Sequence, residues 1–204
     1  MNKVIVVGGG AAGLLAAVAA AEHGAQVTVL EKMFKPGKKL LITGKGRCNI
    51  TNDCDLQEII KNIPGNGRFL NSALRQFTNE DVVKLLNDNG LETKVERGGR
   101  VFPVSDQAKD VVDTLLKILH DLGVELVTDI CVTEVLTDTE KVIGVKTKSG
   151  KVFKADAVIV AAGGASYPGT GSDGSGFKLA EKLGHAIIPL KPSLVPLTSD
   201  CLLY

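Results

Sequence analysis

The stretch that decides the fold is VIVVGGGAAGLLAAVAAA, residues 4–21, which contains no charged residue. Its length is close to the about 18 to 20 apolar residues of a membrane-spanning helix. Lys3 before it, with Ala17 and Ala19 within it, also fits a secretion signal and its cleavage site. The order of residue types argues against both interpretations, because a β-branched run stops at consecutive glycines before an Ala- and Leu-rich run begins. The sequence therefore predicts a short strand that turns sharply into a helix.

The glycines of this turn have a spacing that indicates a ligand. Gly8, Gly10 and Gly13 form the pattern G-x-G-x-x-G of a dinucleotide-binding turn. Gly8 permits the tight turn, Gly10 lets the backbone approach a diphosphate, and Gly13 lets the helix pack close to the strand. The diphosphate is expected at the helix N-terminus, where unpaired N–H groups and the helix dipole favour an anion.

An acidic residue follows at the distance that this pattern requires. Gly24 can end the helix, and a second predicted strand, residues 26–31, ends in Glu31. A carboxylate about 20 residues beyond the glycines binds the hydroxyls of the adenosine ribose. It favours a ribose without a 2′-phosphate, as in FAD or NAD. These residues therefore predict a dinucleotide site and leave both cofactors open.

The composition narrows the classes of partner. The 204 residues include 24 basic and 23 acidic side chains, so a net charge of +1 gives no electrostatic reason to expect nucleic acid or an anionic membrane. The cysteines lack C-x-x-C pairing and no histidine cluster accompanies them, which indicates neither a metal site nor a disulfide framework. We expect a reduced, cytoplasmic protein that acts on a small molecule.

The rest of the chain alternates between a polar loop, helices and strands. Residues 32–52 are rich in glycine and lysine and predict a binding loop in which Lys38, Lys39 and Arg47 can donate to a diphosphate, although a solvated basic loop is the alternative. Helices are predicted over residues 68–77, over 79–89 with Asn79 as N-cap, and over 106–122 with Asp106 as N-cap. A hairpin or loop pair is expected within residues 91–104.

Four short strands with period-two patterning, residues 124–127, 132–137, 142–147 and 151–154, predict an antiparallel meander. A buried strand with paired glycines at its end follows, within residues 155–164. A meander inserted before such a strand resembles the fold of the two-dinucleotide-binding-domain flavoproteins. The fold class that this resemblance implies is α/β: a Rossmann-like FAD-binding domain with a parallel sheet flanked by helices and a small antiparallel β-meander.

Longer motifs carry a more specific resemblance. They are GKKL (37–40) with TGKGRCNITN (43–52), IPGNGRFL (63–70) with GRVFP (99–103), and AGGASYPGTG (162–171). With these motifs the chain resembles a bacterial family of aminoacetone-oxidase-like, NAD(P)/FAD-dependent oxidoreductases. The resemblance covers nearly the whole chain and is most specific in residues 43–52.

The resemblance implies non-covalently bound FAD. It leaves the catalytic residues unidentified. Cys48 is a candidate, but we expect it to have a structural role beside the flavin, because the sequence places no charged base or resolving thiol near it. By position, it places Gly8, Gly10, Ala12 and Gly13 around the diphosphate, Glu31 at the ribose, Lys32 and Lys39 along the cofactor, Arg47, Asn49 and Thr51 nearest the flavin ring, Val132 near the adenine, and Ala162 and Gly163 closing over it.

The family's length implies a domain division. Its members are much longer, so we expect residues 1–190 to form the N-terminal part of an FAD-binding domain. Residues 191–204 are expected to begin a truncated substrate domain. On this interpretation the chain is an N-terminal half that does not complete a competent enzyme alone.

The leading functional hypothesis is an FAD-dependent oxidoreductase that moves a hydride between flavin and a small organic substrate. The family indicates a small amine as substrate, and reduction of an unsaturated substrate by NAD(P)H is the other direction. The first alternative is an NAD-dependent dehydrogenase without flavin. The second is a non-catalytic nucleotide-binding fragment that acts through a partner.

Overall fold

The glycine stretch folds as a strand, a turn and a helix in the computed structural model, which describes residues 1–139 and 141–191. Strand β1 covers Lys3–Val7, and helix α1 covers Ala11–Glu22 after its N-cap Gly10. The prediction of two elements is confirmed. In the described ranges, no helix has both the length and the apolar character needed to cross a membrane.

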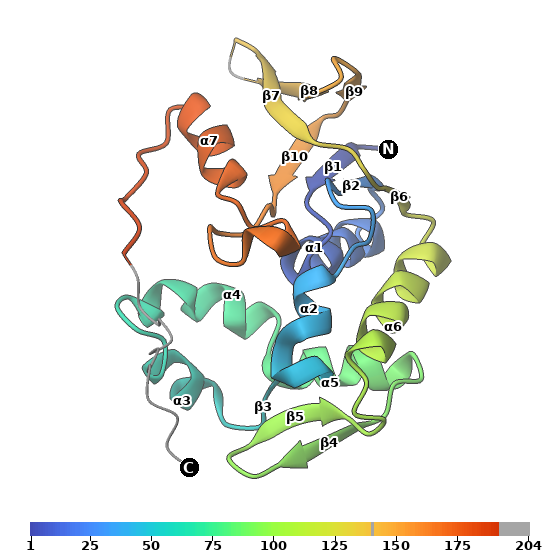
Figure 1. Cartoon of the computed structure of the whole chain (residues 1–204), viewed down its shortest axis with the longest axis vertical. Helices are drawn as coiled ribbons and strands as arrows, with labels where there is room; N and C mark the ends of the chain where they lie inside the picture. The colour runs from blue at the N-terminus through green and yellow to red at the C-terminus, as the bar shows by residue number, and fades with distance from the viewer. Residues whose placement is uncertain (140, 192–204) are drawn as a thin grey trace, which may run out of the picture.

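A four-stranded parallel sheet organises the domain (Figure 1). Its strands, in spatial order, are β10 (Ala157–Val160), β1, β2 (Gln26–Leu30) and β6 (Glu125–Val127). Every neighbouring pair is parallel. Because β1 is central, the turn at its carboxyl end lies at the middle of one edge of the sheet.

The two faces of β1 enter different cores, as the alternation of side chains along a strand requires. Val4 and Val6 pack with α1 and with α6, which covers Ala108–Asp121. Ile5 and Val7 pack instead with residues of the antiparallel meander. A strand buried on both faces needs a continuous apolar run, which explains the sequence VIVV.

The antiparallel meander has three strands: β7 (Val132–Asp138), β8 (Lys141–Thr147) and β9 (Val152–Lys154). The prediction of a fourth strand at residues 124–127 is wrong, because β6 pairs in parallel with β2 and belongs to the main sheet. Such a short strand carries too few side chains to specify its partner. Its position follows from the packing of the preceding helix α6 against α1.

A second antiparallel sheet, in the order β3-β5-β4, lies at the end of the molecule away from the meander (Figure 1). The predicted hairpin is confirmed as β4 (Thr93–Glu96) and β5 (Arg100–Pro103).

The segment 32–52 is more helical than expected, because it contains the short helices α2 (Lys38–Ile42) and η1 (Thr43–Gly46). The remaining elements are β3 (Thr51–Asn52), α3 (Leu56–Lys61), η2 (Gly67–Leu70), α4 (Asn71–Gln76), α5 (Asn79–Asp88), η3 (Pro168–Thr170) and α7 (Ser175–Lys182).

Two predicted helix caps are wrong. The N-cap of α5 is Thr78, which forms a capping box with Asp81, and Asn79 uses its side chain to bind the carbonyls of Asn52 and Cys54 instead. Helix α6 begins after Gln107, because Asp106 has a left-handed backbone (φ 56°) and its carboxylate binds two basic side chains. In both cases a contact distant in sequence takes the side chain away from the helix end.

The predicted domain start at residues 191–204 lies outside the described residues except for Lys191. The division of the chain into residues 1–190 and 191–204 therefore stays a prediction.

Gly13 provides a direct test of how the turn is packed. A Cβ on Gly13 would overlap the carbonyl oxygen of Gly8, so α1 would have to move away from β1. We expect Gly13→Ala to destabilise the fold by about 2 kcal/mol or more and to lower the Tm by about 4 °C or more. Gly10→Ala is the matched control, since its φ is −86° and its Cβ meets no atom within 4 Å. Equal melting temperatures for the two variants would contradict the packing.

Candidate cofactor-binding site

A cavity of about 350 Å³ opens at the carboxyl ends of β1 and β2. This edge is where open parallel sheets bind their ligands. Its walls come from four parts of the chain, within residues 7–12, 30–43, 130–132 and 161–179. Of the predicted cofactor residues, the cavity is lined by Gly8, Gly10, Ala12, Glu31, Lys32, Lys39, Val132, Ala162 and Gly163. The structure thus brings together segments that are far apart in sequence.

The N-terminus of α1 provides an anion-binding wall. Gly10, Ala11 and Ala12 line the cavity, and the first turn of α1 has neither a side-chain cap nor an acidic residue. The N–H groups of this turn lack intrahelical acceptors and stand at the positive end of the helix dipole. These features fit the diphosphate of a dinucleotide. Gly13 does not line the cavity and instead allows α1 to approach Gly8.

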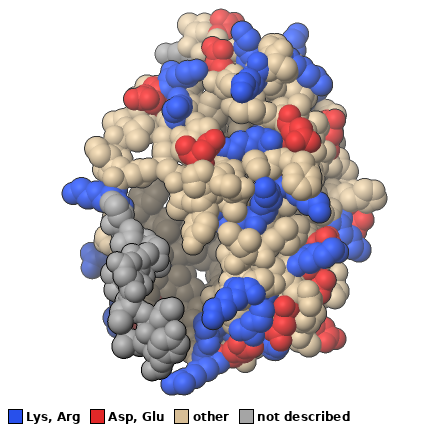
Figure 2. Space-filling view, in the orientation of Figure 1, with Lys and Arg blue, Asp and Glu red and all other residues tan. Residues whose placement is uncertain are grey.

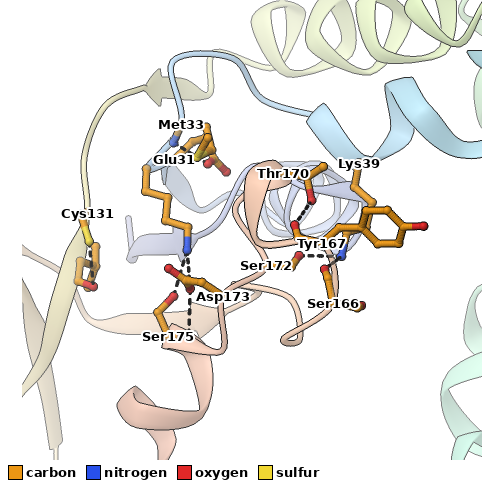
Figure 3. A network of polar contacts seen from close by, with 12 residues as sticks. Glu31, Met33, Lys39, Cys131, Ser166, Tyr167, Thr170, Ser172, Asp173 and Ser175 are labelled. Carbon is orange, nitrogen blue, oxygen red and sulfur yellow. Dashed lines mark hydrogen bonds and ion pairs between the residues drawn. The ribbon is translucent and has the colours of Figure 1, made fainter. Parts of the chain in front are cut away.

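Glu31 is buried and holds the glycine turn. Its side chain is only 8% exposed, so it is not a solvated residue at a strand end. One carboxylate oxygen accepts the backbone N–H of Gly9 at 2.6 Å, and the other accepts the N–H of Met33 at 2.7 Å. Figure 3 shows Glu31 beside Met33. The carboxylate lines the cavity while it connects the turn after β1 to the segment after β2. Its binding to the ribose stays a prediction.

The loop between β10 and α7, residues 163–174, closes one side of the cavity, and we call it the strap. Three lysines of the segment after β2 fasten it, and Figure 3 shows the contacts of Lys39 with Ser166 and Ser172. Lys32 Nζ lies 2.6 Å from Asp173 Oδ1 and 3.1 Å from Ser175 Oγ. Lys38 Nζ donates to the carbonyl of Gly169, and Lys39 Nζ donates to the strap at two oxygens. The basic segment is therefore neither a solvated loop nor wholly free for a ligand.

Asp173 is held ionised by its neighbours. The hydrogen bond from Lys32 is the main cause that lowers the pKa of this carboxyl well below its ordinary value of 3.8, and hydrogen bonds from Ser175 add to it. The charge of Lys32 is thus balanced within the protein. The ion pair of Lys32 with Asp173 attaches the strap to the segment after β2 at neutral pH.

The other predicted flavin-side residues do not reach this cavity. Arg47 forms a bidentate pair with Glu96 at 2.8 and 3.1 Å, contacts Asp106 at 3.1 Å, and stacks on the ring of Phe102. These interactions attach the segment 43–52 to the β4–β5 hairpin. The hydrogen bonds to Glu96 are the main cause that raises the pKa of Arg47.

Asn49 and Thr51 belong to the same outer region. In the orientation that satisfies its hydrogen bonds, the amide nitrogen of Asn49 donates to the carbonyls of Val101 and Thr51. Thr51 lies in β3, opposite Val101 of β5. Neither residue is among those that line the cavity. Contact of Arg47, Asn49 and Thr51 with the flavin ring stays a prediction.

Cys48 is a packing residue in this structure. It is 1% exposed, and burial raises the pKa of its thiol above the ordinary value. A thiol that resists ionisation is a poor nucleophile. The structural role expected for Cys48 agrees with this environment.

Sequence reasoning missed several residues of the cavity. Cys131 and Ser172 line it, as do Gly9, Lys35 and Thr43. Cys131 and Ser172 carry no spacing signal of their own. Cys131 directly precedes the predicted residue Val132, which was the one indication in the sequence. Ser172 lies beside the predicted residue Gly163 only in the folded structure.

Comparisons with known proteins agree with this geometry. Residues 2–195 match the family described as HI0933-like protein Rossmann domain. The chain is 40% identical, over 97% of its length and 47% of the relative's, to the 3-dehydro-bile acid delta(4,6)-reductase of Clostridium scindens. It is 33% identical, over 95% of its length and 47% of the relative's, to the ribosomal RNA dihydrouridine synthase of Escherichia coli.

Among solved structures, THI4 of Thermovibrio ammonificans has a similar fold, with a TM-score of 0.58, 17% identity, and coverage of 91% of this chain and 64% of that one. The chain spans about half the length of the two curated relatives that it matches.

The two hydrogen bonds to Glu31 predict that this residue stabilises the protein without any ligand. The substitution Glu31→Ala leaves two backbone N–H groups without acceptors. We expect Glu31→Ala to lower the free energy of unfolding of the cofactor-free protein by about 2 to 4 kcal/mol. Urea denaturation measures this loss. An unchanged unfolding midpoint would show that Glu31 does not hold the turn.

The ion pair at the strap predicts a pH dependence of stability. Since the folded-state pKa of Asp173 is lowered, its contribution is complete above the unfolded value near 3.8 and is lost as the pH falls through the folded value. We expect the difference in Tm between wild type and Asp173→Asn to be constant from pH 7 to about 5 and to shrink below about pH 4. A difference that already disappears between pH 7 and 5 would contradict this assignment.

Proposed function

Because the chain belongs to the HI0933-like family of Rossmann-domain proteins, we propose that it is the FAD-binding part of an oxidoreductase that reduces a carbon–carbon double bond. FAD is the cofactor of this domain, and the family relatives are flavin-dependent oxidoreductases. The observation that carries the choice of reaction is the 40% identity to a bile acid reductase over nearly the whole chain.

The residues of the cavity have separate tasks in this proposal. The N-terminus of α1 binds the diphosphate, and Glu31 binds the adenosine ribose while it keeps the glycine turn in place. The strap and its lysines exclude water from one side of the cofactor. Bound FAD supplies hydride transfer, so the protein needs to orient the substrate more than it needs an acid–base pair of its own.

The names of two relatives describe related chemistry on different molecules. A 3-dehydro-bile acid with Δ4 unsaturation has a ketone next to the double bond that is reduced. Dihydrouridine is uridine with hydrogen added across a ring double bond that is conjugated to a carbonyl. A carbonyl withdraws electrons from the adjacent double bond and prepares its far carbon for a hydride. An α,β-unsaturated carbonyl compound is therefore the proposed substrate class.

A small molecule is a better substrate for this chain than RNA. The net charge is only +1. On the face drawn in Figure 2, basic and acidic side chains are interspersed. RNA-binding surfaces have clustered basic side chains, because neutralised phosphates supply much of the affinity. Charge therefore favours the small organic substrate expected from the sequence.

Oxidation of a small amine is the second candidate, supported by the motifs that resemble aminoacetone-oxidase-like proteins. An NAD-dependent dehydrogenase is less well supported, because the meander β7–β9 and the strap are added to the plain dinucleotide fold. Both alternatives use the same glycine turn and Glu31. The turn therefore does not separate them; the cofactor that binds separates the dehydrogenase, and the substrate separates the amine oxidase.

An anaerobic half-reaction decides the direction of chemistry. The protein, in the full length that its gene encodes, is loaded with FAD, reduced chemically without oxygen and mixed with an α,β-unsaturated ketone. We expect the oxidised flavin absorbance to return with the enone and not with the saturated ketone of the same skeleton. If the enone leaves the flavin reduced while a small amine bleaches the oxidised form, the protein is an amine oxidase and the proposed reaction is wrong.

A further inference from the structure

Lys39 carries a positive charge that no acidic side chain of the described ranges balances. Its Nζ donates to two neutral oxygens of the strap, the carbonyl of Ser166 at 3.0 Å and Ser172 Oγ at 2.7 Å. An ammonium has three protons, so one donor is left over. Lys32 differs, because its charge is paired with Asp173. Both lysines line the cavity, and of these two only Lys39 lacks an acidic partner in the described ranges. Lys35 and Lys38 also line the cavity without an acidic partner there, but only Lys39 donates to a buried hydroxyl.

Ser172 is the partner of this charge. Its side chain is 7% exposed, and its Oγ accepts from Lys39. The hydroxyl hydrogen therefore remains available, and none of residues 1–139 and 141–191 accepts it. Ser172 lies against the turn after β10, since a Cβ on Gly163 would come within 2.8 Å of its Oγ. The free donor of a buried hydroxyl thus belongs to the wall of the cavity.

The backbone of α2 directs Lys39 across the cavity. Gly37, just before α2, donates its N–H to the carbonyl of Gly9 at 2.8 Å, which ties the start of the helix to the glycine turn. On its other side Gly37 meets Val112 of α6, where a Cβ would come within 2.9 Å. Lys39 is therefore carried on a short helix held between the turn and α6, and Figure 3 shows its side chain pointing to the strap.

We propose that Lys39 and Ser172 form an anion-binding pair that receives a phosphate of the dinucleotide, in addition to the N-terminus of α1. Lys39 supplies the charge and orients the hydroxyl, and Ser172 donates the hydrogen bond. The pair rests on the proposed function only in that the ligand is FAD. It assigns a task to Ser172 and separates the tasks of Lys39 and Lys32: Lys39 binds the ligand, whereas Lys32 only fastens the strap.

The test compares FAD affinity, measured by quenching of flavin fluorescence, for wild type and matched variants. We expect Lys39→Met to weaken FAD binding by about 10- to 100-fold and Ser172→Ala by about 3- to 10-fold. Lys39→Arg keeps the charge and should retain most of the affinity. Because Ser172 acts through Lys39, adding Ser172→Ala to Lys39→Met should weaken FAD binding by no more than about a further 2-fold.

Lys32→Met is the control for a loosened strap, and we expect it to weaken FAD binding by less than about 3-fold. Melting temperatures without FAD, recorded for every variant, separate lost binding from lost folding. If Lys39→Met folds and binds FAD as wild type does, or if Lys32→Met loses as much affinity, the assignment of the pair is wrong. If Lys39→Met does not fold, an undiminished affinity in Ser172→Ala overturns it. Failure of wild type to bind FAD would instead refute the proposed function.

Discussion

The close contact between α1 and the end of β1 is the constraint on which the rest of the structure depends. Gly13 leaves no space for a side chain beside the carbonyl oxygen of Gly8, so the helix can start directly over the strand. That position puts the free N–H groups of the first turn at the sheet edge and leaves Gly10 open to the cavity. Glu31 then fixes the turn from the neighbouring strand. Fold and ligand site thus share one geometric requirement.

The remaining walls of the cavity are attached to this turn by polar contacts distant in sequence. Glu31 connects it to the segment after β2, and the lysines of that segment hold the strap, which comes more than a hundred residues later. Within the strap, Ser172 packs against Gly163, which follows β10, the strand beside β1. A change in any of these attachments is transmitted to the walls of the cavity. Stability and ligand binding are therefore coupled in this domain.

Local features were predictable from the sequence, and partners were not. Strand, turn and helix follow from residues 4–21 because glycine spacing and side-chain pattern act over short distances. The strand that pairs with β6 depends on how α6 packs. Asp106 does not cap α6 as expected, because its carboxylate forms ion pairs with Arg47 and Lys94. The buried carboxylate of Glu31 accepts the backbone N–H groups of Gly9 and Met33, and no sequence pattern predicts these contacts. Most predicted cofactor residues do line one cavity, whereas Thr51 lies in the antiparallel sheet β3-β5-β4, and Arg47 and Asn49 contact that sheet.

The central claim is that this cavity binds FAD through the glycine turn, and a thermal-shift titration with FAD and NAD tests it most directly. A ligand that binds the native state raises the Tm with concentration. The account predicts a saturable rise with FAD, which disappears in Gly10→Val because the branched side chain enters the space of the diphosphate, and little change with NAD. An equal or larger rise with NAD, or a rise with FAD that persists in Gly10→Val, would contradict it.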